Sequence, residues 1–365
     1  SINAGWNIIS DPVVTFNHWY KSLFPSAISK AFQYSTSYQI VDSLVPGKGY
    51  WIKFLSSMNE TITGDSMPTV TMTVDSGWNM IGSVDHIVSA PSGGMVISKT
   101  FAYKGSYQIV STLNPGQGYW IKTNKSGLLT LGPQALPRTT TNPLDSYTEI
   151  TIADKLGRKQ KLYLAPSTDS RINPDVYSMP PIPPGDAFDI RFVSQRMLEV
   201  IPQDIQDAAV FPVQMQSAAY PITVTYAIKN SGGKQVILDE QQSGTQQHHV
   251  LKGEGSLTIS AGNENTLSMR VTNGKEIPLS FALKQNFPNP FNPTTKIAFD
   301  VPVASRVTIK VYDIIGREIM TPANGFFEAG SYMVSMDFNT LASGIYFYRL
   351  TAGDFTDVKK MVVTK

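Results

Sequence analysis

Hydrophobic and polar residues alternate most regularly towards the end of the chain. Ile297, Phe299 and Val301 are separated by smaller or polar residues, and 307–311 repeats the pattern. A period of two residues places alternate side chains on opposite faces of a strand, so these segments are predicted to be half-buried β-strands. More segments of this kind lie within 278–365, which predicts a compact immunoglobulin-like sandwich there.

The middle of the chain has shorter apolar runs that are separated by turn residues. These runs predict a β-sandwich over residues 134–277. The predicted strands are 189–193, 212–216, 222–228, 235–239, 255–260 and 266–272. Pro180, Pro181, Pro183 and Pro184 come shortly before the first of them and predict an extended, exposed segment.

An internal repeat occupies the first third of the chain. Gly5–Ile9 (GWNII) returns as Gly77–Ile81 (GWNMI), and Pro46–Lys53 (PGKGYWIK) returns as Pro115–Lys122 (PGQGYWIK). In each PGxG segment, Pro followed by Gly predicts a tight turn, and the second Gly frees the backbone before an aromatic strand. Each copy is therefore predicted to open on a GWN strand and to return through a turn into a GYWIK strand.

The repeat predicts two homologous β-rich lobes. The offset between the copies is 72 residues at GWN and 69 at GYWIK, so the first copy carries three extra residues. Only 13–32, which contains Pro25, shows a pattern compatible with a helix. The predicted fold class is therefore all-β and multidomain, with domains at 1–66, 67–133, 134–277 and 278–365.

Composition limits the classes of function that the chain can have. Of the 365 residues, 41% are hydrophobic and only 16% are charged, against about 25% in typical globular domains. The net charge of +2 gives no sign of a phosphate-binding surface, so no nucleic-acid partner is predicted. The absence of cysteine excludes disulfides, thiolate nucleophiles and cysteine metal sites. No apolar run approaches the length of about 18 residues that a membrane span needs.

Aromatic residues of the two copies are the main candidates for binding. They could form two equivalent platforms for sugar rings or for a partner protein, because aromatic side chains combine a large contact area with a polar group. The alternative is that they form the small cores of the two lobes. The candidates are Trp6, Tyr38, Tyr50 and Trp51 in the first copy, and Trp78, Tyr107, Tyr119 and Trp120 in the second.

Few residues suggest catalysis or metal binding. The histidines are His18, His86, His248 and His249. The adjacent pair would point to opposite faces of a strand, which does not suit a shared metal ion. Carboxylates that could contribute to a calcium site are Asp175, Asp186 and Asp189, but their spacing fits no calcium loop. No catalytic residue, metal site or cofactor is predicted, although a carboxylate pair assembled from distant segments stays open.

The end of the chain carries a recognisable series of motifs. From Leu279 it reads LSFALKQNFPNPFNPTTKIAFDVP, then VTIKVYDIIGREI, and finally LASGIYFYRLTAGDFTDVKKMVVTK. This series resembles the type A C-terminal sorting domain of the type IX secretion system, which Bacteroidota and their relatives use for export. The matching residues are Asn286, Pro288, Asn289, Pro290, Phe291, Gly316, Gly344, Tyr346, Gly353, Lys359, Lys360 and Lys365. In a weaker way, the first third is similar to repeats of large secreted proteins of the same bacteria.

The resemblance implies an extracellular or cell-surface location, with the type IX machinery as a partner. We expect a non-enzymatic structural or adhesive protein, a component of the cell surface or of a filament that associates with itself through strand edges or flat contacts. The alternative is a carbohydrate-binding or accessory C-terminal region of a larger secreted hydrolase, with a glycan as ligand. Because export needs a signal peptide and the chain starts at Ser1 without one, we expect that a leader has been removed.

Overall fold

The chain folds almost entirely into β-strands, which confirms the predicted all-β class. The computed structural model describes residues 1–133, 142–231, 233–242, 245–260, 266–273, 278, 280–339 and 341–364. The chain divides into two compact units. Unit 1 comprises Ser1–Gln246 and Val250–Val271, and unit 2 comprises Gln247–His249 and Thr272–Lys365. The finer division of unit 1 into two lobes and a sandwich domain stays a prediction.

The first repeat forms a four-stranded sheet with the order β1-β4-β2-β3. Its strands are β1 (Gly5–Ser10), β2 (Ala31–Tyr34), β3 (Tyr38–Val41) and β4 (Gly49–Phe54). The GWN and GYWIK segments are therefore antiparallel neighbours. The segment 13–32 holds only the four-residue helix α1 (Tyr20–Leu23), because Pro25 follows it closely and β2 begins at Ala31.

The second repeat forms a sheet with the equivalent order, β6-β11-β8-β9. Its strands are β6 (Gly77–Ile81), β8 (Thr100–Tyr103), β9 (Tyr107–Val110) and β11 (Tyr119–Thr123). Two small sheets accompany it, β5 (Val70–Val74) with β12 (Gly127–Leu131), and β7 (Val88–Ser89) with β10 (Thr112–Leu113). None of the helices in the described parts of the chain is both long and apolar enough to cross a membrane.

The two four-stranded sheets also share their strand register. The tryptophan of GWN lies opposite the lysine of GYWIK in both, as Trp6 with Lys53 and Trp78 with Lys122. The lysine Nζ lies 5.9 Å from the indole centroid in the first pair and 5.8 Å in the second. At this distance an ammonium group is attracted to the face of the indole. The repeated residues therefore make the same local contacts in both copies.

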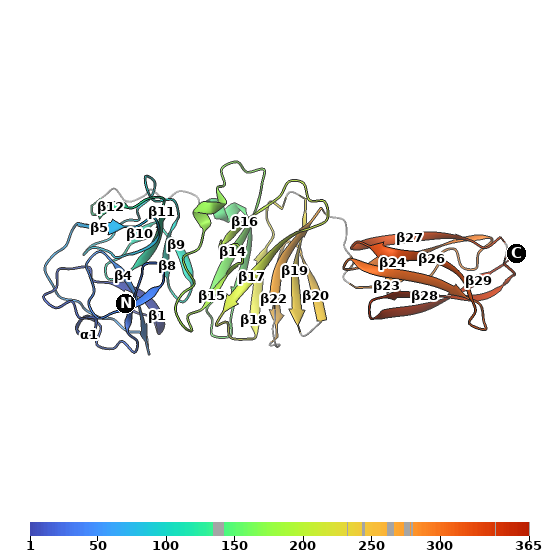
Figure 1. The fold of residues 1–365 in the computed structure, drawn as a ribbon, viewed down its shortest axis with the longest axis horizontal. Coiled ribbons are helices and arrows are strands. Elements are labelled where there is room, and N and C mark those ends of the chain that lie inside the picture. Colours follow the sequence, from blue (N-terminus) through green and yellow to red (C-terminus); the bar gives the residue numbers. More distant parts are fainter. Residues whose placement is uncertain are drawn as a thin grey trace. The chain divides into compact units, whose positions relative to one another are not determined.

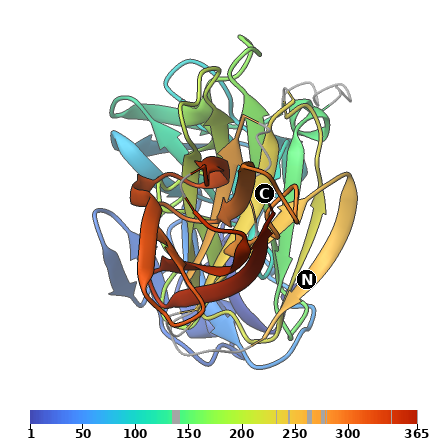
Figure 2. The same cartoon turned by 90° about the vertical axis from the view of Figure 1, so that its right-hand side faces the viewer.

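Most of the rest of unit 1 consists of two five-stranded sheets, coloured green to orange (Figure 1 and Figure 2). The sheet β16-β14-β13-β18-β21 contains β13 (Thr148–Ala153), β14 (Lys159–Pro166), β16 (Leu198–Ile201), β18 (Ile222–Ala227) and β21 (Glu254–Ile259). The sheet β15-β17-β22-β19-β20 contains β15 (Asp189–Phe192), β17 (Ala209–Gln216), β19 (Gln235–Gln242), β20 (Thr245–Leu251) and β22 (Thr266–Thr272). The 3-10 turns η1 (Pro143–Ser146) and η2 (Pro174–Tyr177) precede β13 and β15. All six strands predicted here are present, and buried side chains of both sheets form one core.

Unit 2 contains a three-stranded sheet, β23-β24-β27, and a four-stranded sheet, β26-β25-β28-β29. The strands are β23 (Ala282–Leu283), β24 (Thr294–Val301), β25 (Ser305–Tyr312), β26 (Glu318–Phe327), β27 (Gly330–Asp337), β28 (Gly344–Ala352) and β29 (Phe355–Val363). Ile297, Phe299 and Val301 are fully buried, as the alternation predicts. Side chains of both sheets meet in a single core.

Candidate functional site: the aromatic junction and the C-terminal motifs

The GYWIK strands divide their side chains between two cores. In β4, Tyr50 and Ile52 belong to a cluster within the first repeat, whereas Trp51 points the other way into a separate, larger cluster. The strand β11 divides in the same manner and places Trp120 in the larger cluster. Both tryptophans are 0% exposed. The period of two residues therefore gives each GYWIK strand two buried faces.

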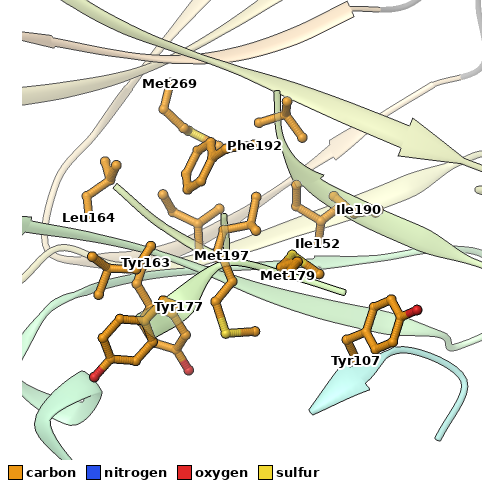
Figure 3. Packing of buried hydrophobic residues seen from close by; sticks show 14 of the residues in the cluster. Tyr107, Ile152, Tyr163, Leu164, Tyr177, Met179, Ile190, Phe192, Met197 and Met269 are labelled. Atoms are coloured by element: carbon orange, nitrogen blue, oxygen red, sulfur yellow. The ribbon is translucent and has the colours of Figure 1, made fainter. Parts of the chain in front are cut away.

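The larger cluster joins the repeats to the sandwich. Besides both tryptophans it contains Tyr107 of β9, and it continues through Ile152, Met179, Ile190 and Met197 of the sandwich (Figure 3). Separating the repeats from the sandwich would expose this apolar and aromatic surface to water, which is strongly unfavourable. The two repeats and the two five-stranded sheets therefore share one cluster of buried side chains.

Each repeat packs its tryptophan against a tyrosine of the other. The rings of Trp51 and Tyr103 have centroids 4.7 Å apart, and those of Trp120 and Tyr34 have centroids 5.1 Å apart. Tyr103 and Tyr34 occupy equivalent positions at the ends of β8 and β2. The exchange is therefore reciprocal, and both pairs have the edge-to-face geometry that aromatic rings prefer.

The turns before the GYWIK strands also meet across the two repeats. The backbone N–H of Ser10 donates to Gly116 O at 3.0 Å, and that of Gly82 donates to Gly47 O at 2.7 Å, at equivalent positions. A Cβ atom at Gly118 would lie 2.5 Å from Ile8 Cγ2. One at Gly49 would lie 2.7 Å from the carbonyl oxygen of Ile81. The second glycine of PGxG thus permits close contact between the copies, which a Cβ would prevent.

The segment 180–192 fastens the sandwich to both repeats. The hydroxyls of Tyr103 and Tyr107 donate to the carbonyls of Phe188 and Pro181, each at 2.9 Å. Asp186 accepts hydrogen bonds from Trp6 Nε1 and from Lys53 Nζ of the first repeat, at 2.8 and 2.7 Å.

The proline-rich part of this segment was predicted to be exposed, but Pro180 and Pro183 are buried. The prediction is wrong because these prolines lie in the junction, the name used here for segment 180–192 and the side chains of the repeats that contact it. Their carbonyls accept hydrogen bonds from Arg191 and Gln216.

A buried ion pair lies within this junction. Arg191 is 0% exposed and Asp189 is 2% exposed, with 2.8 Å between Arg191 Nη2 and Asp189 Oδ1. The guanidinium carbon lies 5.8 Å from the centre of the Tyr107 ring. Burial raises the pKa of the Asp189 carboxyl, and the hydrogen bond from Arg191 opposes that rise. Burial likewise raises the pKa values of Tyr103 and Tyr107, so these hydroxyls serve as neutral donors.

The predicted aromatic platforms do not lie open to solvent. Five of the eight candidates are almost fully buried, namely Tyr50, Trp51, Tyr107, Tyr119 and Trp120. Trp6, Tyr38 and Trp78 are half-buried against the same core. The structure therefore corrects the platform hypothesis, because packing between the copies and against the sandwich covers the rings. The alternative that they form cores holds in a modified form, since Trp51 and Trp120 belong to a shared core rather than to small separate ones.

The polar candidates are dispersed among separate contacts. His18 Nδ1 lies 3.3 Å from the buried Asp11, and His86 Nδ1 lies 2.7 Å from Asp85, whose other oxygen accepts from Ser66. His248 and His249 lie on β20. The three calcium candidates Asp175, Asp186 and Asp189 are ion-paired with Arg196, Lys53 and Arg191 respectively. Among the residues that the structure describes, no three His, Asp or Glu side chains gather into a metal-binding group.

In unit 2, the segment 286–291 contacts the last strand, β29, and fixes it to the rest of the unit. Asn286 is buried, its Oδ1 accepts from Gln285 Nε2 at 2.7 Å, and its side-chain amide donates to Pro288 O and Thr295 Oγ1 at 3.1 and 3.0 Å. Asn289 Oδ1 accepts from the backbone of Val362 at 2.9 Å. Phe291 is buried, and its backbone N–H donates to Val362 O at 3.1 Å. The motif residues therefore hold β29 in place.

The remaining motif residues of unit 2 shape turns and edges. Gly316 and Gly353 have φ angles of 85° and 56°, in the region that favours glycine, and Gly353 lies in the turn between β28 and β29. The hydroxyl of Tyr346, two residues after Gly344, donates to Ala342 O at 3.0 Å. On β29, Lys360 is exposed and Lys359 is half-exposed beside Asp357. Lys365 lies outside the described residues.

Comparison with known families decides the nature of this unit. Residues 285–364 match the family model described as the secretion system C-terminal sorting domain. Unit 2 contains a C-terminal sorting domain. This domain indicates export through the type IX secretion system and implies an extracellular or cell-surface location. Comparison with curated proteins finds no match for the chain.

The sorting domain could be recognised from the sequence, whereas the contacts between the repeats and segment 180–192 in unit 1 could not. The first motif residues of the sorting domain, such as Asn286 and Phe291, lie close together along the chain, and the later ones follow in a fixed order. The junction instead joins 180–192 to residues such as Trp6 and Tyr103, which are far away in sequence. A signal that could have revealed it is the presence of Asp189 and Arg191 in the predicted strand 189–193, because two charged residues are unusual in a buried strand.

Proposed function

We propose that the protein is a non-enzymatic structural or adhesive component of the cell surface or of an extracellular filament, delivered by its sorting domain. Within this proposal, the sorting domain is an immunoglobulin-like sandwich that the type IX machinery recognises. The observation that carries the proposal is the shared core of unit 1. It joins both repeats to the sandwich, as a module of an extracellular assembly would require.

Exposed apolar side chains support self-association. A monomeric soluble protein buries most large apolar residues, so an excess on one region favours contact with a partner. The first repeat exposes more of them than the second. They are Val14, Phe16, Trp19, Ile28, Ile40, Val45 and Leu55 in the first repeat, and Ile87, Ile97 and Leu128 in the second.

The carbohydrate-binding alternative has weaker support. It relied on aromatic platforms, and the rings of Trp51 and Trp120 are covered by protein. A sugar-binding role would show as glycan binding that Trp51→Ala abolishes without unfolding the protein. Burial makes that combination unexpected, because removing a buried tryptophan leaves a large cavity.

Electron microscopy and size-exclusion light scattering on protein secreted by its native host test the proposal. Ordered filaments or sheets would support it, and a monodisperse monomer at high concentration in native salt would contradict it. The double variant Phe16→Ser with Trp19→Ser is expected to weaken assembly without unfolding, since Phe16 is fully exposed and Trp19 is 51% exposed. Leu128→Ser, at a residue of the second repeat that is 66% exposed, is the matched control and should leave assembly unchanged.

A further inference from the structure

Two edge strands of unit 2 are protected against pairing with another chain. At β29, Gln285 Nε2 donates to Lys360 O at 2.7 Å. Phe291 N–H also donates to Val362 O, so the segment before β24 covers part of this edge. At β26, Pro322 lies within the strand, and the register with β25 shifts as at a β-bulge. Covering segments, prolines and bulges all prevent strand addition at an edge.

The edge strand β27 has none of these protections. Its eight residues, Gly330–Asp337, pair with β24 in an unbroken register, and β24 is its only neighbour among the described strands of the sheet. They include no proline and no basic residue, and Asp337 at the end is the one charged residue. Met333, near the middle of the strand, is 64% exposed. A long, regular edge with an exposed apolar side chain is a site where another strand can add.

The register with β24 determines which backbone groups of β27 face its open side, away from β24. Phe338 N–H donates to Pro293 O at 2.9 Å and continues the ladder between the two strands. Residues of an antiparallel pair alternate between those that bond to the neighbouring strand and those whose N–H and C=O point away from it. The even-numbered residues of β27 therefore bond to β24. The residues that direct their backbone groups to the open side, where the described residues offer them no hydrogen bond, are Ser331, Met333, Ser335 and Asp337.

The open side of β27 is complementary to itself. An antiparallel pairing about a two-fold axis at Val334 opposes Met333 with Ser335 of a second copy. The same pairing opposes Ser331 with Asp337 of that copy, so the one charge of the strand meets a neutral residue and not its own mate. Both members of each pair direct N–H and C=O to the open side and can exchange both backbone hydrogen bonds. The two Met333 side chains become diagonal neighbours across the axis, within reach of each other.

We propose that two copies of this chain add their β27 strands edge to edge, in an isologous dimer with its two-fold axis at Val334. The occupant is a second copy because each open-side group finds its partner in the same strand of that copy, over the whole of 331–337. The three-stranded sheets of the two copies would then form one continuous sheet. An isologous contact closes after two copies, so a further contact at the first repeat would be needed to link dimers into a filament. The inference rests on the proposed self-association and assigns one of its contacts to unit 2.

The register is tested with a single introduced cysteine, because the chain has none of its own. At the axis, Val334 opposes itself in a non-hydrogen-bonded pair, where Cα atoms lie about 4.5 Å apart, a spacing that a disulfide can bridge. Val334→Cys should therefore cross-link two copies about tenfold faster than Ser331→Cys, because the axis raises the effective concentration of the thiol. Ser331→Cys is the matched control, since it is more exposed and opposes Asp337. Equal or slower cross-linking of Val334→Cys would overturn the two-fold pairing.

The contact itself is tested by light scattering and hydrogen exchange. With rising concentration, the mass should increase from 40.1 kDa towards twice that value. Exchange at the amides of Met333 and Ser335 should slow by about tenfold over the same range, because they enter a ladder. Met333→Lys should abolish both changes, since a lysine on an edge strand opposes strand addition. Val358→Lys, at a residue of β29 that is 49% exposed, is the matched control and should alter neither.

The β27 contact and the proposed assembly fail in different ways. The double variant Phe16→Ser with Trp19→Ser should leave the β27 dimer unchanged. A dimer that this double variant loses and Met333→Lys keeps would overturn the β27 contact and support association through the first repeat. Dimers that Met333→Lys dissociates, without filaments or sheets from the native host, would support the β27 contact and contradict the proposed assembly. Protection of the edge amides only by a different protein would overturn the second copy as occupant.

Discussion

The two repeats of unit 1 have the same sheet and different surroundings. Both place a buried tryptophan in the shared core and a turn glycine against the other copy. The second repeat fixes its Tyr103 and Tyr107 hydroxyls on the junction segment 180–192, whereas the first contacts it through the exposed side chain of Asp186. The comparison teaches that a repeated motif encodes a common scaffold, and that neighbouring segments give each copy its own role.

The largest effects are expected at the two buried tryptophans. Trp51→Ala and Trp120→Ala should each lower the free energy of unfolding of unit 1 by about 3–5 kcal/mol, because each leaves a large cavity in the shared core. Urea denaturation measures the loss. Near-equal losses would support the equivalence of the copies. A variant with unchanged stability would show that its ring is not part of the core.

The turn glycines should come next. Gly118→Ala and Gly49→Ala place a Cβ within 2.5 and 2.7 Å of atoms of the other repeat, and overpacking of this kind costs about 1–3 kcal/mol. Gly325→Ala in unit 2 is the control, because among the described residues the nearest heavy atom to its Cβ would be Phe327 Cε2 at 3.7 Å, an ordinary contact distance. Thermal unfolding of the three variants gives the comparison. A wild-type melting temperature for Gly118→Ala would contradict the close contact between the copies.

Equivalent tyrosines of the two repeats should respond differently to loss of the hydroxyl. Tyr107→Phe removes a hydrogen bond to Pro181 O and should cost about 0.5–1.5 kcal/mol. Tyr38→Phe should be near neutral, since the buried Tyr38 hydroxyl has no hydrogen-bond partner of ordinary geometry in the described residues. Chemical denaturation of both variants is the measurement. A larger loss for Tyr38→Phe than for Tyr107→Phe would contradict the account that the hydrogen bond to Pro181 makes the difference between the two tyrosines.

The smallest effect concerns the contact of the first repeat with the junction. Hydrogen bonds from Lys53 and then Trp6 lower the pKa of the Asp186 carboxyl below its usual range. Its contribution to stability is therefore present above the ordinary aspartate pKa and is lost as the pH falls through the lowered folded value. Asp186→Asn should remove this carboxyl's contribution to the pH dependence of the free energy of unfolding. Unfolding curves between about pH 5 and pH 2 test it, and an unchanged slope would contradict the assignment.

Much of the fold could be predicted from local patterns. The alternation at Ile297–Val301 and the runs in the middle of the chain correspond to observed strands. The strand β16 (Leu198–Ile201) was missed because it is short, and β20 (Thr245–Leu251) was expected only around His248 and His249, because glutamines hide the rest of its period. β16 depends on parallel pairing with the distant strand β14, which local propensity does not report.

The candidate site was harder to predict than the fold. Strand alternation shows that Trp51 and Tyr50 face opposite ways, but it does not show that both faces are covered. That depends on the reciprocal packing of Trp51 on Tyr103 and on the junction at Asp189 and Arg191, which lie more than a hundred residues away from Trp51. Tertiary contacts of this separation decide whether an aromatic residue binds a ligand or fills a core.

The most direct test of the shared core is urea unfolding followed separately in the repeats and in the sandwich. All five tryptophans lie in the repeats, so their fluorescence reports the repeats alone. Hydrogen exchange at Ile150, Leu162 and Leu164 reports the sandwich. A shared core predicts one transition with the same midpoint for both probes. Two separate transitions, with the repeats unfolding while the sandwich stays protected, would contradict the account.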